Sequence, residues 1–257
     1  MFGVLLSGNR KGLRRRGYAS GVSALGLSAL LMAGAASVEA QARCDSVRVA
    51  ALPVIERPAT SDTNATLVVL LTGDGGWAGA DEKVAIGLRA RGAAVVGLNM
   101  RSYLGDKKTP DQVASDVGCI AQVFGDRWKR PRLMLLGYSR GADIVPFVAA
   151  RWPAALRERL NMVAMVSLSQ SANFKFHLID LVRDVKRDDD VLVAPEIAKL
   201  KGLRVVCVYG EDESDSGCRG ADPQVLTAYA RPGGHRLTEG FEGVADILSA
   251  GLRPARP

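Results

Sequence analysis

Short, almost continuously apolar stretches alternate along the chain with stretches in which apolar residues recur every three to four positions. The first pattern is typical of strands buried on both faces of a parallel sheet, and the second of amphipathic helices. The expected strands are 65–71, 93–100, 133–136, 161–169, 203–209 and 225–230. The expected helices are 81–91, 110–124, 141–151 and 239–252. This alternation predicts an α/β fold: a mostly parallel sheet with helices on both faces.

The helix expected from residue 110 carries the strongest local signals. Thr109 is a capping residue, Pro110 stands at the first helical position, and Gln112 can return a hydrogen bond to the cap. Four apolar residues then fall on one face of the helix: Val113, Val117, Ile120 and Phe124.

Two segments are harder to assign. Residues 47–55 are apolar and β-branched enough for a first strand, which Pro53 would confine to an edge of the sheet because it lacks a backbone donor. Residues 171–200 are irregular and carry mixed charges. They are either an insertion that covers the functional site or a solvated linker followed by one helix.

Residues 1–42 differ in composition from the rest of the chain. Five basic residues at positions 10–16 precede an apolar run over 21–36, and small residues follow near 38–42. This order is typical of a secretory signal peptide that is removed on export, and the alternative is an uncleaved membrane anchor. We therefore expect a signal peptide over 1–42 and a single domain over 43–257.

Composition and charge narrow the classes of function. With 47% hydrophobic and 24% charged residues among 257, the chain has the composition of an ordinary globular protein. Because the expected leader carries five basic residues and one acid, the net charge falls from +7 to +3 without it. A nucleic-acid partner therefore has little support.

The four cysteines, Cys44, Cys119, Cys207 and Cys218, all lie beyond the expected leader. An even number of cysteines in an exported protein predicts disulfides, and four cysteines allow three pairings. We favour Cys207 with Cys218, which would close a short loop, and Cys44 with Cys119, which would fix the mature N-terminus. The spacing matches no zinc pattern, and we expect neither a metal nor an organic cofactor.

The stretch 133–143 carries the main functional signal. Four apolar residues lead into the pentapeptide GYSRG at 137–141, and the pattern then becomes helical. A G-x-S-x-G sequence between a strand and a helix is typical of the nucleophile elbow of α/β-hydrolases. The turn strains the serine backbone and needs the room that Gly137 and Gly141 supply. We therefore expect Ser139 to be the nucleophile.

A nucleophilic serine needs a base that is itself held by an acid. Of the two histidines, His235 follows the last expected strand, where α/β-hydrolases place their base, whereas His177 precedes any acid loop. We expect His177 to have a structural role or to line the substrate site. Four carboxylates follow strand 203–209. Of these, Glu213 is favoured as the acid, and Asp215 is the alternative.

An oxyanion hole needs two backbone N–H groups aimed at one point. One comes from the residue after the nucleophile, here Arg140, and the other from the turn after an earlier strand. The glycine-rich turn 73–76 is placed for the second donor, which either Asp74 or Gly75 would supply. A phosphate-binding loop is the competing interpretation, but the turn lacks the Gly-Lys-Ser/Thr ending and the G-x-G-x-x-G spacing.

Several motifs occur together in one order: GDGGW at 73–77, GYSRGAD at 137–143, CVYG at 207–210 with Cys218, and GGH at 233–235. Together they resemble the VirJ/AcvB family of bacterial virulence proteins, over about 66 to 252. Arg140 and Arg236 depart from the pattern, where an aromatic residue and a second histidine are expected. The resemblance implies a periplasmic α/β-hydrolase that releases the amino acid from aminoacyl-phosphatidylglycerol.

The implied substrate suggests further roles. The lipid phosphate next to the ester could be met by Arg140 or by the basic residues of 175–187, and the ammonium group by Asp74 or Asp143. Asp143 could equally stabilise the helix dipole. Trp77 could belong to the core or face the lipid.

Two other functions fit the same motifs. One is a non-catalytic periplasmic interaction protein, a possible secretion-system component, because a fold does not guarantee activity. The other is a general esterase for small soluble esters. A serine, an acid, a histidine and a glycine-rich turn are more than an interaction scaffold requires. We therefore expect a serine ester hydrolase whose partner is an aminoacylated phospholipid at the membrane surface.

Overall fold

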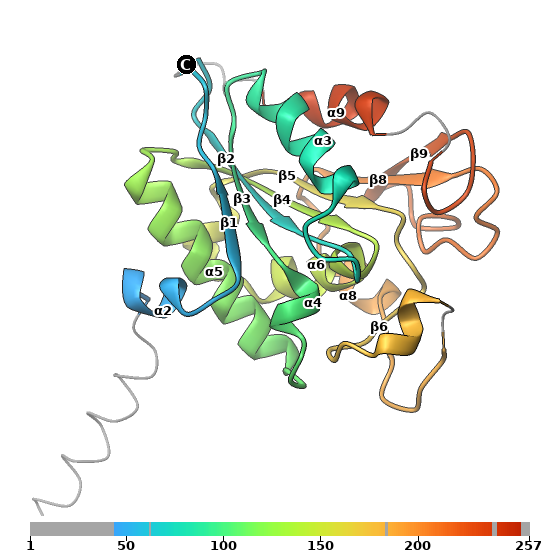
Figure 1. The fold of residues 1–257 in the computed structure, drawn as a ribbon. Helices are drawn as coiled ribbons and strands as arrows, with labels where there is room; N and C mark the ends of the chain where they lie inside the picture. The colour runs from blue at the N-terminus through green and yellow to red at the C-terminus, as the bar shows by residue number, and fades with distance from the viewer. Residues whose placement is uncertain (1–43, 62, 183–184, 238–240, 253–257) are drawn as a thin grey trace, which may run out of the picture. The chain divides into compact units, whose positions relative to one another are not determined.

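The almost continuously apolar stretches form one seven-stranded sheet in a computed structural model of the protein, which describes residues 44–61, 63–182, 185–237 and 241–252 (Figure 1). The expected signal peptide lies outside these residues. The strands are β1 (Val54–Arg57), β2 (Thr66–Leu71), β3 (Ala94–Leu98), β4 (Arg132–Tyr138), β5 (Leu160–Val166), β8 (Val205–Gly210) and β9 (Leu226–Arg231). Their order across the sheet is β1-β3-β2-β4-β5-β8-β9.

The sheet is mostly parallel, as the sequence predicts. Every neighbouring pair from β3 across to β9 is parallel, and β1 pairs antiparallel with β3 at the edge. Strands β2 and β3 are buried at every position because elements cover both faces. Strand β4 lies in the middle of the order, so the residue that follows it stands at the centre of the carboxyl edge of the sheet.

Helices cover both faces of the sheet (Figure 1). On one face α3 (Gly79–Arg89) packs against α9 (Glu242–Ser249). The other face carries α2 (Ser46–Ala50), α5 (Pro110–Arg127), α6 (Arg140–Arg151) and α8 (Ala194–Ala198). Each face has its own cluster of buried apolar side chains. The short helices α4 (Met100–Tyr103) and α7 (Ala154–Arg157) lie in connections.

Helix α5 begins as its sequence predicts. Thr109 accepts a hydrogen bond from the backbone N–H of Gln112 at 3.2 Å, and the Gln112 side chain accepts one from the N–H of Thr109 at 2.8 Å. The predicted apolar face is confirmed, because all four of its members are buried: Val113, Val117, Ile120 and Phe124.

The prediction of a strand over 47–55 is wrong for most of its length. Asp45 accepts a hydrogen bond from the N–H of Arg48 at 2.9 Å and so starts helix α2. Val49 is buried on the α5 side of the sheet, and the Arg48 side chain donates to Asp116 of α5 at 2.7 Å. The edge strand predicted here begins only at Val54, after Pro53.

Residues 171–193, which we call the insertion, stand apart from the main sheet. Strands β6 (Ser171–Ala172) and β7 (Val191–Leu192) pair antiparallel as a separate two-stranded sheet. Between them lies a single turn of 3₁₀ helix, η1 (Leu178–Leu181).

Both favoured cysteine pairs are disulfides. Cys44–Cys119 joins the chain before α2 to α5, and Cys207–Cys218 joins β8 to the loop that follows it. Two such bonds indicate an oxidising compartment and thus an exported protein. Within the described part of the chain, no helix has both the length and the apolar character needed to cross a bilayer.

Candidate active site

Ser139 stands at the sharp turn between β4 and α6. Its φ of 52° lies in the left-handed region, which a residue with a side chain adopts only where its surroundings enforce it. A side chain at residue 137 would collide with the backbone of Gly141, and one at residue 141 would collide with the carbonyl group of Leu71. Both glycines are therefore required, as the sequence predicts.

Ser139 is the first member of a hydrogen-bonded chain. Its Oγ lies 2.8 Å from Nε2 of His235, and Nδ1 of His235 lies 2.7 Å from Oε1 of Glu213. The Glu213 side chain is only 10% exposed, and its other oxygen accepts the N–H of Gly210 at 2.8 Å. An imidazole in this position can take the hydroxyl proton while the carboxylate fixes the tautomer. The arrangement can therefore activate Ser139.

The loops that carry the base and the acid are tied together. The N–H of Asp212 donates to the carbonyl of Gly233 at 3.0 Å, and Ser167 Oγ donates to the carbonyl of His235 at 2.9 Å. The Cys207–Cys218 disulfide joins β8 to the far side of the acid loop. These contacts hold the imidazole and the carboxylate in place before any ligand binds.

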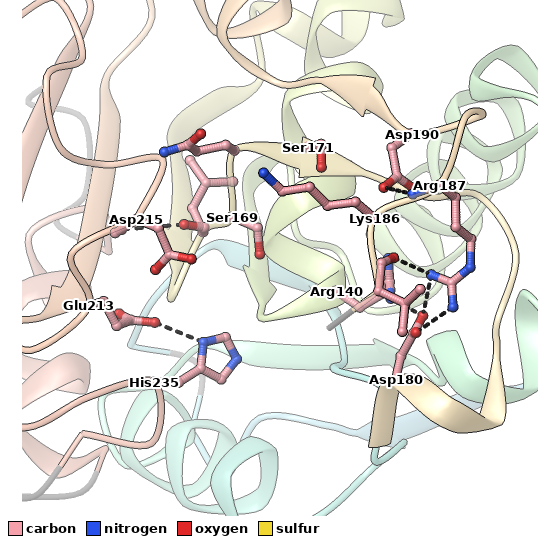
Figure 2. A pocket seen from close by; sticks show the side chains of 14 residues that line it. Arg140, Ser169, Ser171, Asp180, Lys186, Arg187, Asp190, Glu213, Asp215 and His235 are labelled. Atoms are coloured by element: carbon pink, nitrogen blue, oxygen red, sulfur yellow. Dashed lines mark hydrogen bonds and ion pairs between the residues drawn. The ribbon is translucent and has the colours of Figure 1, made fainter. Parts of the chain in front are cut away.

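Asp215, the alternative acid, is placed differently. It is exposed and lines a cavity beside Glu213. The dashed line in Figure 2 joins His235 to Glu213 and not to Asp215. In this structure Glu213 thus occupies the position of the acid.

The glycine-rich turn 73–76 lies against the serine. A Cβ on its first residue would stand 3.2 Å from the Cβ of Ser139. Arg140 is the first residue of α6, so its backbone N–H has no partner within the helix. The candidate oxyanion donors, the N–H of Arg140 and that of Asp74 or Gly75, therefore belong to segments that adjoin the serine.

The side chain of Arg140 is used within the protein. It donates to Asp74 at 3.2–3.3 Å and to Asp180 of η1 at 2.8 Å. Arg187 donates to the other oxygen of Asp180 at 2.6 Å, and the Asp180 side chain is 1% exposed. Arg140 and Asp74 thus pair with each other in this structure, and the roles expected for them, contact with a lipid phosphate and with an ammonium, stay predictions.

The ion pairs of Asp180 decide whether residues 171–200 are an insertion that covers the site or a solvated linker. Asp180 anchors η1 beside the elbow, and it lines the same cavity as Ser139. The segment is therefore an insertion at the site rather than a solvated linker.

Two cavities adjoin His235. The larger has a volume of about 740 Å³ and is lined by Ser139, the turn 73–76, the start of α3, and Leu181 and Val182 of the insertion. Because Ser139 lies in its wall, this cavity can receive a carbonyl group next to the nucleophile.

The smaller cavity has a volume of about 150 Å³ and is also lined by Asp180 of η1. Figure 2 shows Glu213 and His235 on one side of it and Asp180 and Arg187 on the other, with Lys186 extending between them. The two cavities share Asp180 and His235 as lining residues, and of the two the larger is the one that Ser139 lines.

Two residues expected near the substrate line neither cavity. Trp77 packs against Gly97 of β3, and its Nε1 donates to Glu82 at 2.6 Å. Of the two interpretations of Trp77, the core residue is the one observed. His177 directly precedes η1, and its Nε2 is buried without a hydrogen-bond partner among the described residues.

Asp143 also lies outside both cavities. It is 4% exposed, and Oδ1 accepts the N–H of Ser169 at 2.8 Å. Burial raises its pKa to about 7, although the hydrogen bond from Ser169 and the charge of Arg140 oppose the rise. In this structure the Asp143 carboxylate holds the chain after β5, and the expectation that it binds the substrate stays a prediction.

Sequence reasoning missed Asp81 and Lys83, which line the larger cavity from the N-terminal part of α3. The sequence held a signal for these residues. The helix begins directly after the turn 73–76, so its first residues must lie close to the cavity that this turn lines.

Comparisons with solved structures identify the fold. TT1662 from Thermus thermophilus is 18% identical with a TM-score of 0.55, over 83% of this chain and 99% of its own. XC6422 from Xanthomonas campestris, an α/β serine hydrolase without a lid, is 19% identical with a TM-score of 0.50, over 79% and 89%. Est1E from Butyrivibrio proteoclasticus, bound to ferulic acid, is 13% identical with a TM-score of 0.53, over 77% and 92%. At these identities the similarity shows the fold alone, which is that of the α/β-hydrolases.

Sequence comparison identifies the family. No curated protein sequence matches the chain. The profile of the family described as bacterial virulence protein (VirJ) matches residues 65–256, which is more than half of the chain and includes every residue of the hydrogen-bonded chain above. The protein therefore belongs to the VirJ family.

Proposed function

We propose that this protein is a serine hydrolase that cleaves the carboxylic ester of lysyl- or alanyl-phosphatidylglycerol and releases phosphatidylglycerol and the free amino acid. The observation that carries the proposal is the hydrogen-bonded chain from Ser139 through His235 to Glu213. The same set of groups performs acyl transfer on unrelated folds. The lipid class comes from the resemblance to the VirJ family, and the cavities and their rim support it.

In the first half of the reaction, Ser139 Oγ attacks the ester carbonyl and His235 Nε2 takes its proton. The N–H of Arg140 and an N–H of the turn 73–76 stabilise the oxyanion that forms on the carbonyl oxygen. Glu213 stabilises the imidazolium. The bond to the glycerol oxygen then breaks, His235 returns the proton to that oxygen, and phosphatidylglycerol leaves.

In the second half, water attacks the aminoacyl ester of Ser139. His235 takes a proton from the water, and the same N–H groups stabilise the second oxyanion. The bond to Ser139 Oγ breaks, Oγ regains the proton from His235, and the free amino acid departs. Water is the co-reactant of the second half, and in both halves the chain's own groups carry the proton and stabilise the oxyanion.

The smaller cavity suits the phosphate of the leaving alcohol. Lys186 is exposed and extends into this cavity (Figure 2). The two arginines of its wall, Arg140 and Arg187, are paired with Asp180. Lys186 is therefore the cation of this wall that can form a charge-assisted hydrogen bond with a phosphate.

The rim of the site favours a lipid ester over a small soluble ester. Leu181 and Val182 line the larger cavity, and Val182 is 83% exposed. Among the described residues, six of the nine exposed large apolar side chains lie in the insertion: Leu178, Ile179, Leu181, Val182, Val191 and Leu192. Exposed apolar side chains gathered at a cavity are typical of a surface that contacts lipid.

The proposed place of action is the periplasmic face of the inner membrane. The two disulfides indicate an oxidising compartment, and a signal peptide over 1–42 would deliver the protein there. At this location the protein would have access to the aminoacyl esters of phosphatidylglycerol in the inner membrane.

The test is hydrolysis of lysyl- and alanyl-phosphatidylglycerol in mixed micelles by the mature protein, beside a soluble short-chain ester and a Ser139→Ala variant. We expect the wild type to release amino acid from the lipid. We expect Ser139→Ala to reduce the rate by roughly 10⁶-fold, to background, because the nucleophile acts as a unit with its base.

The other outcomes select the alternatives. Ser139-dependent turnover of the short ester alone would replace the proposal with a general esterase. No Ser139-dependent turnover of any ester would leave the non-catalytic interaction protein as the explanation.

A further inference from the structure

Asp81 lies in the wall of the larger cavity together with Ser139 and the turn 73–76. It belongs to the first turn of α3 and is only 2% exposed. Acids are rarely so buried unless they are paired, because removing a carboxylate from water costs free energy. The contacts of Asp81 therefore need to be accounted for.

Helix α3 uses one of the two carboxylate oxygens. Oδ2 of Asp81 accepts the N–H of Ala78 at 3.1 Å, which is half of a capping box, since the alanine has no side-chain oxygen with which to complete it. Oδ1 is buried and has no hydrogen-bond partner among the residues that the structure describes. A carboxylate oxygen can accept two hydrogen bonds, so the chain leaves acceptor capacity unused here.

The charge of Asp81 is not neutralised by a described cation either. Burial raises its pKa to about 6, and what opposes this rise is hydrogen bonding from the backbone at Ala78 and Asp81. Burial, and then the charge of Asp81, also raises the pKa of Tyr138. Asp81, Tyr138 and Ser139 line the same cavity.

The other acids of this wall are already paired. Asp74 pairs with Arg140, and Asp180 pairs with both Arg140 and Arg187. Asp81 is thus the acid among the described lining residues that is left for a ligand.

We propose that Asp81 binds the ammonium group of the acyl part of the substrate. The inference rests on the proposed function and assigns the larger cavity to the aminoacyl group. An ammonium supplies both the missing donor and the missing positive charge, in a charge-assisted hydrogen bond. Oδ1 is shielded from solvent in this structure, so binding displaces a small part of the wall around it. The ammonium is either the α-ammonium of any aminoacyl group or the side-chain ammonium of a lysyl group.

The test compares soluble glycerol esters of alanine and of propionic acid, which differ only in the ammonium. Asp81→Asn keeps an oxygen for the N–H of Ala78 but removes the charge. We expect kcat/KM to fall roughly 10- to 100-fold for an aminoacyl ester whose ammonium Asp81 binds, the usual range for a hydrogen bond to a charged group, and the alanyl ester tests the α-ammonium. The value for the propionyl ester should hardly change.

A lysyl glycerol ester identifies the ammonium. Losses for both aminoacyl esters assign the α-ammonium, and a loss for the lysyl ester alone assigns the side-chain ammonium. Equal losses for the propionyl and aminoacyl esters, or no loss for any ester, would overturn the inference.

Glu82→Gln is the matched control. Glu82 is the next residue of the same helix, so the change in charge is the same, but it accepts from Arg57 and Trp77 and lines neither cavity. This variant should not change the ratio of the alanyl to the propionyl rate.

Failure of the inference and failure of the proposed function give different results. If the protein hydrolyses soluble esters but no lipid ester, the proposed lipid substrate is overturned. The soluble esters then still test the role of Asp81. Calorimetry with Ser139→Ala protein needs no turnover: tighter binding of the alanyl than of the propionyl ester should disappear when Asp81→Asn is added. A preference that survives the second substitution would overturn the inference.

Discussion

Among single residues, Glu213 and Asp215 differ in their contact with His235, and this difference predicts their importance. Glu213→Gln should lower kcat by roughly 10³- to 10⁴-fold, because an amide neither stabilises the imidazolium nor fixes the tautomer of the base. Asp215→Asn should lower kcat only slightly, since Asp215 is exposed and makes no hydrogen bond to the imidazole in this structure. Steady-state kinetics on any ester that the wild type hydrolyses checks both variants, and thermal unfolding checks that each is folded. A large loss in Asp215→Asn alone would reverse the assignment.

The three residues of the hydrogen-bonded chain could be named from the sequence because local signals mark each position, with Asp215 left as the alternative to Glu213. Ser139 stands in a recognisable turn, only two histidines exist, and the acid follows a predicted strand. The contacts of Asp143 and Trp77 could not be placed, since they depend on how a helix or a turn is rotated against the sheet. Asp143 lies one turn into α6, and only the packed structure shows it buried against Ser169.

At the level of elements, the insertion is held at the site by a buried acid. Asp180 accepts from Arg140 and Arg187, with a side chain that is 1% exposed. Asp180→Asn should destabilise the insertion by roughly 3–5 kcal/mol, the usual loss when one partner of a buried ion pair is removed. Hydrogen exchange over the insertion should therefore accelerate while the central strands stay protected, and KM for a lipid ester should rise.

Asp189→Asn is the control for that prediction. Asp189 belongs to the same insertion, but it and its partner Lys107 are both exposed, so its replacement should hardly change stability. Similar exchange in the two variants would mean that the buried ion pairs do not anchor η1.

The elements of the sheet could largely be predicted, and the first segment shows where the pattern fails. The apolar run 65–71 predicts a buried strand, and Thr66–Leu71 are indeed buried at every position of β2. In residues 47–55 the pattern of apolar and polar positions is too short to distinguish a strand from a short helix. Contacts distant in sequence decided the outcome: Arg48 binds Asp116, and Cys44 is joined to Cys119.

In the whole molecule, the two disulfides constrain different things. Cys44–Cys119 joins residues separated by 75 positions and attaches the start of the domain to α5, far along the chain from the acid and base loops. Cys207–Cys218 joins residues separated by 11 positions, across the loop that carries Glu213. Cys44–Cys119 should therefore affect mainly the stability of the fold, and Cys207–Cys218 mainly the arrangement of the active site.

This distinction predicts opposite orders of effect in two measurements. In the loop-entropy account, a cross-link stabilises by roughly 4–5 kcal/mol for the longer loop and roughly 3 kcal/mol for the shorter. Replacing Cys44 and Cys119 together with serine should thus lower the free energy of unfolding in urea more than replacing Cys207 and Cys218. The second pair of substitutions should lower kcat more, because Glu213 is then less firmly held against His235. If one double variant were the more impaired in both measurements, the disulfides would not divide their roles in this way.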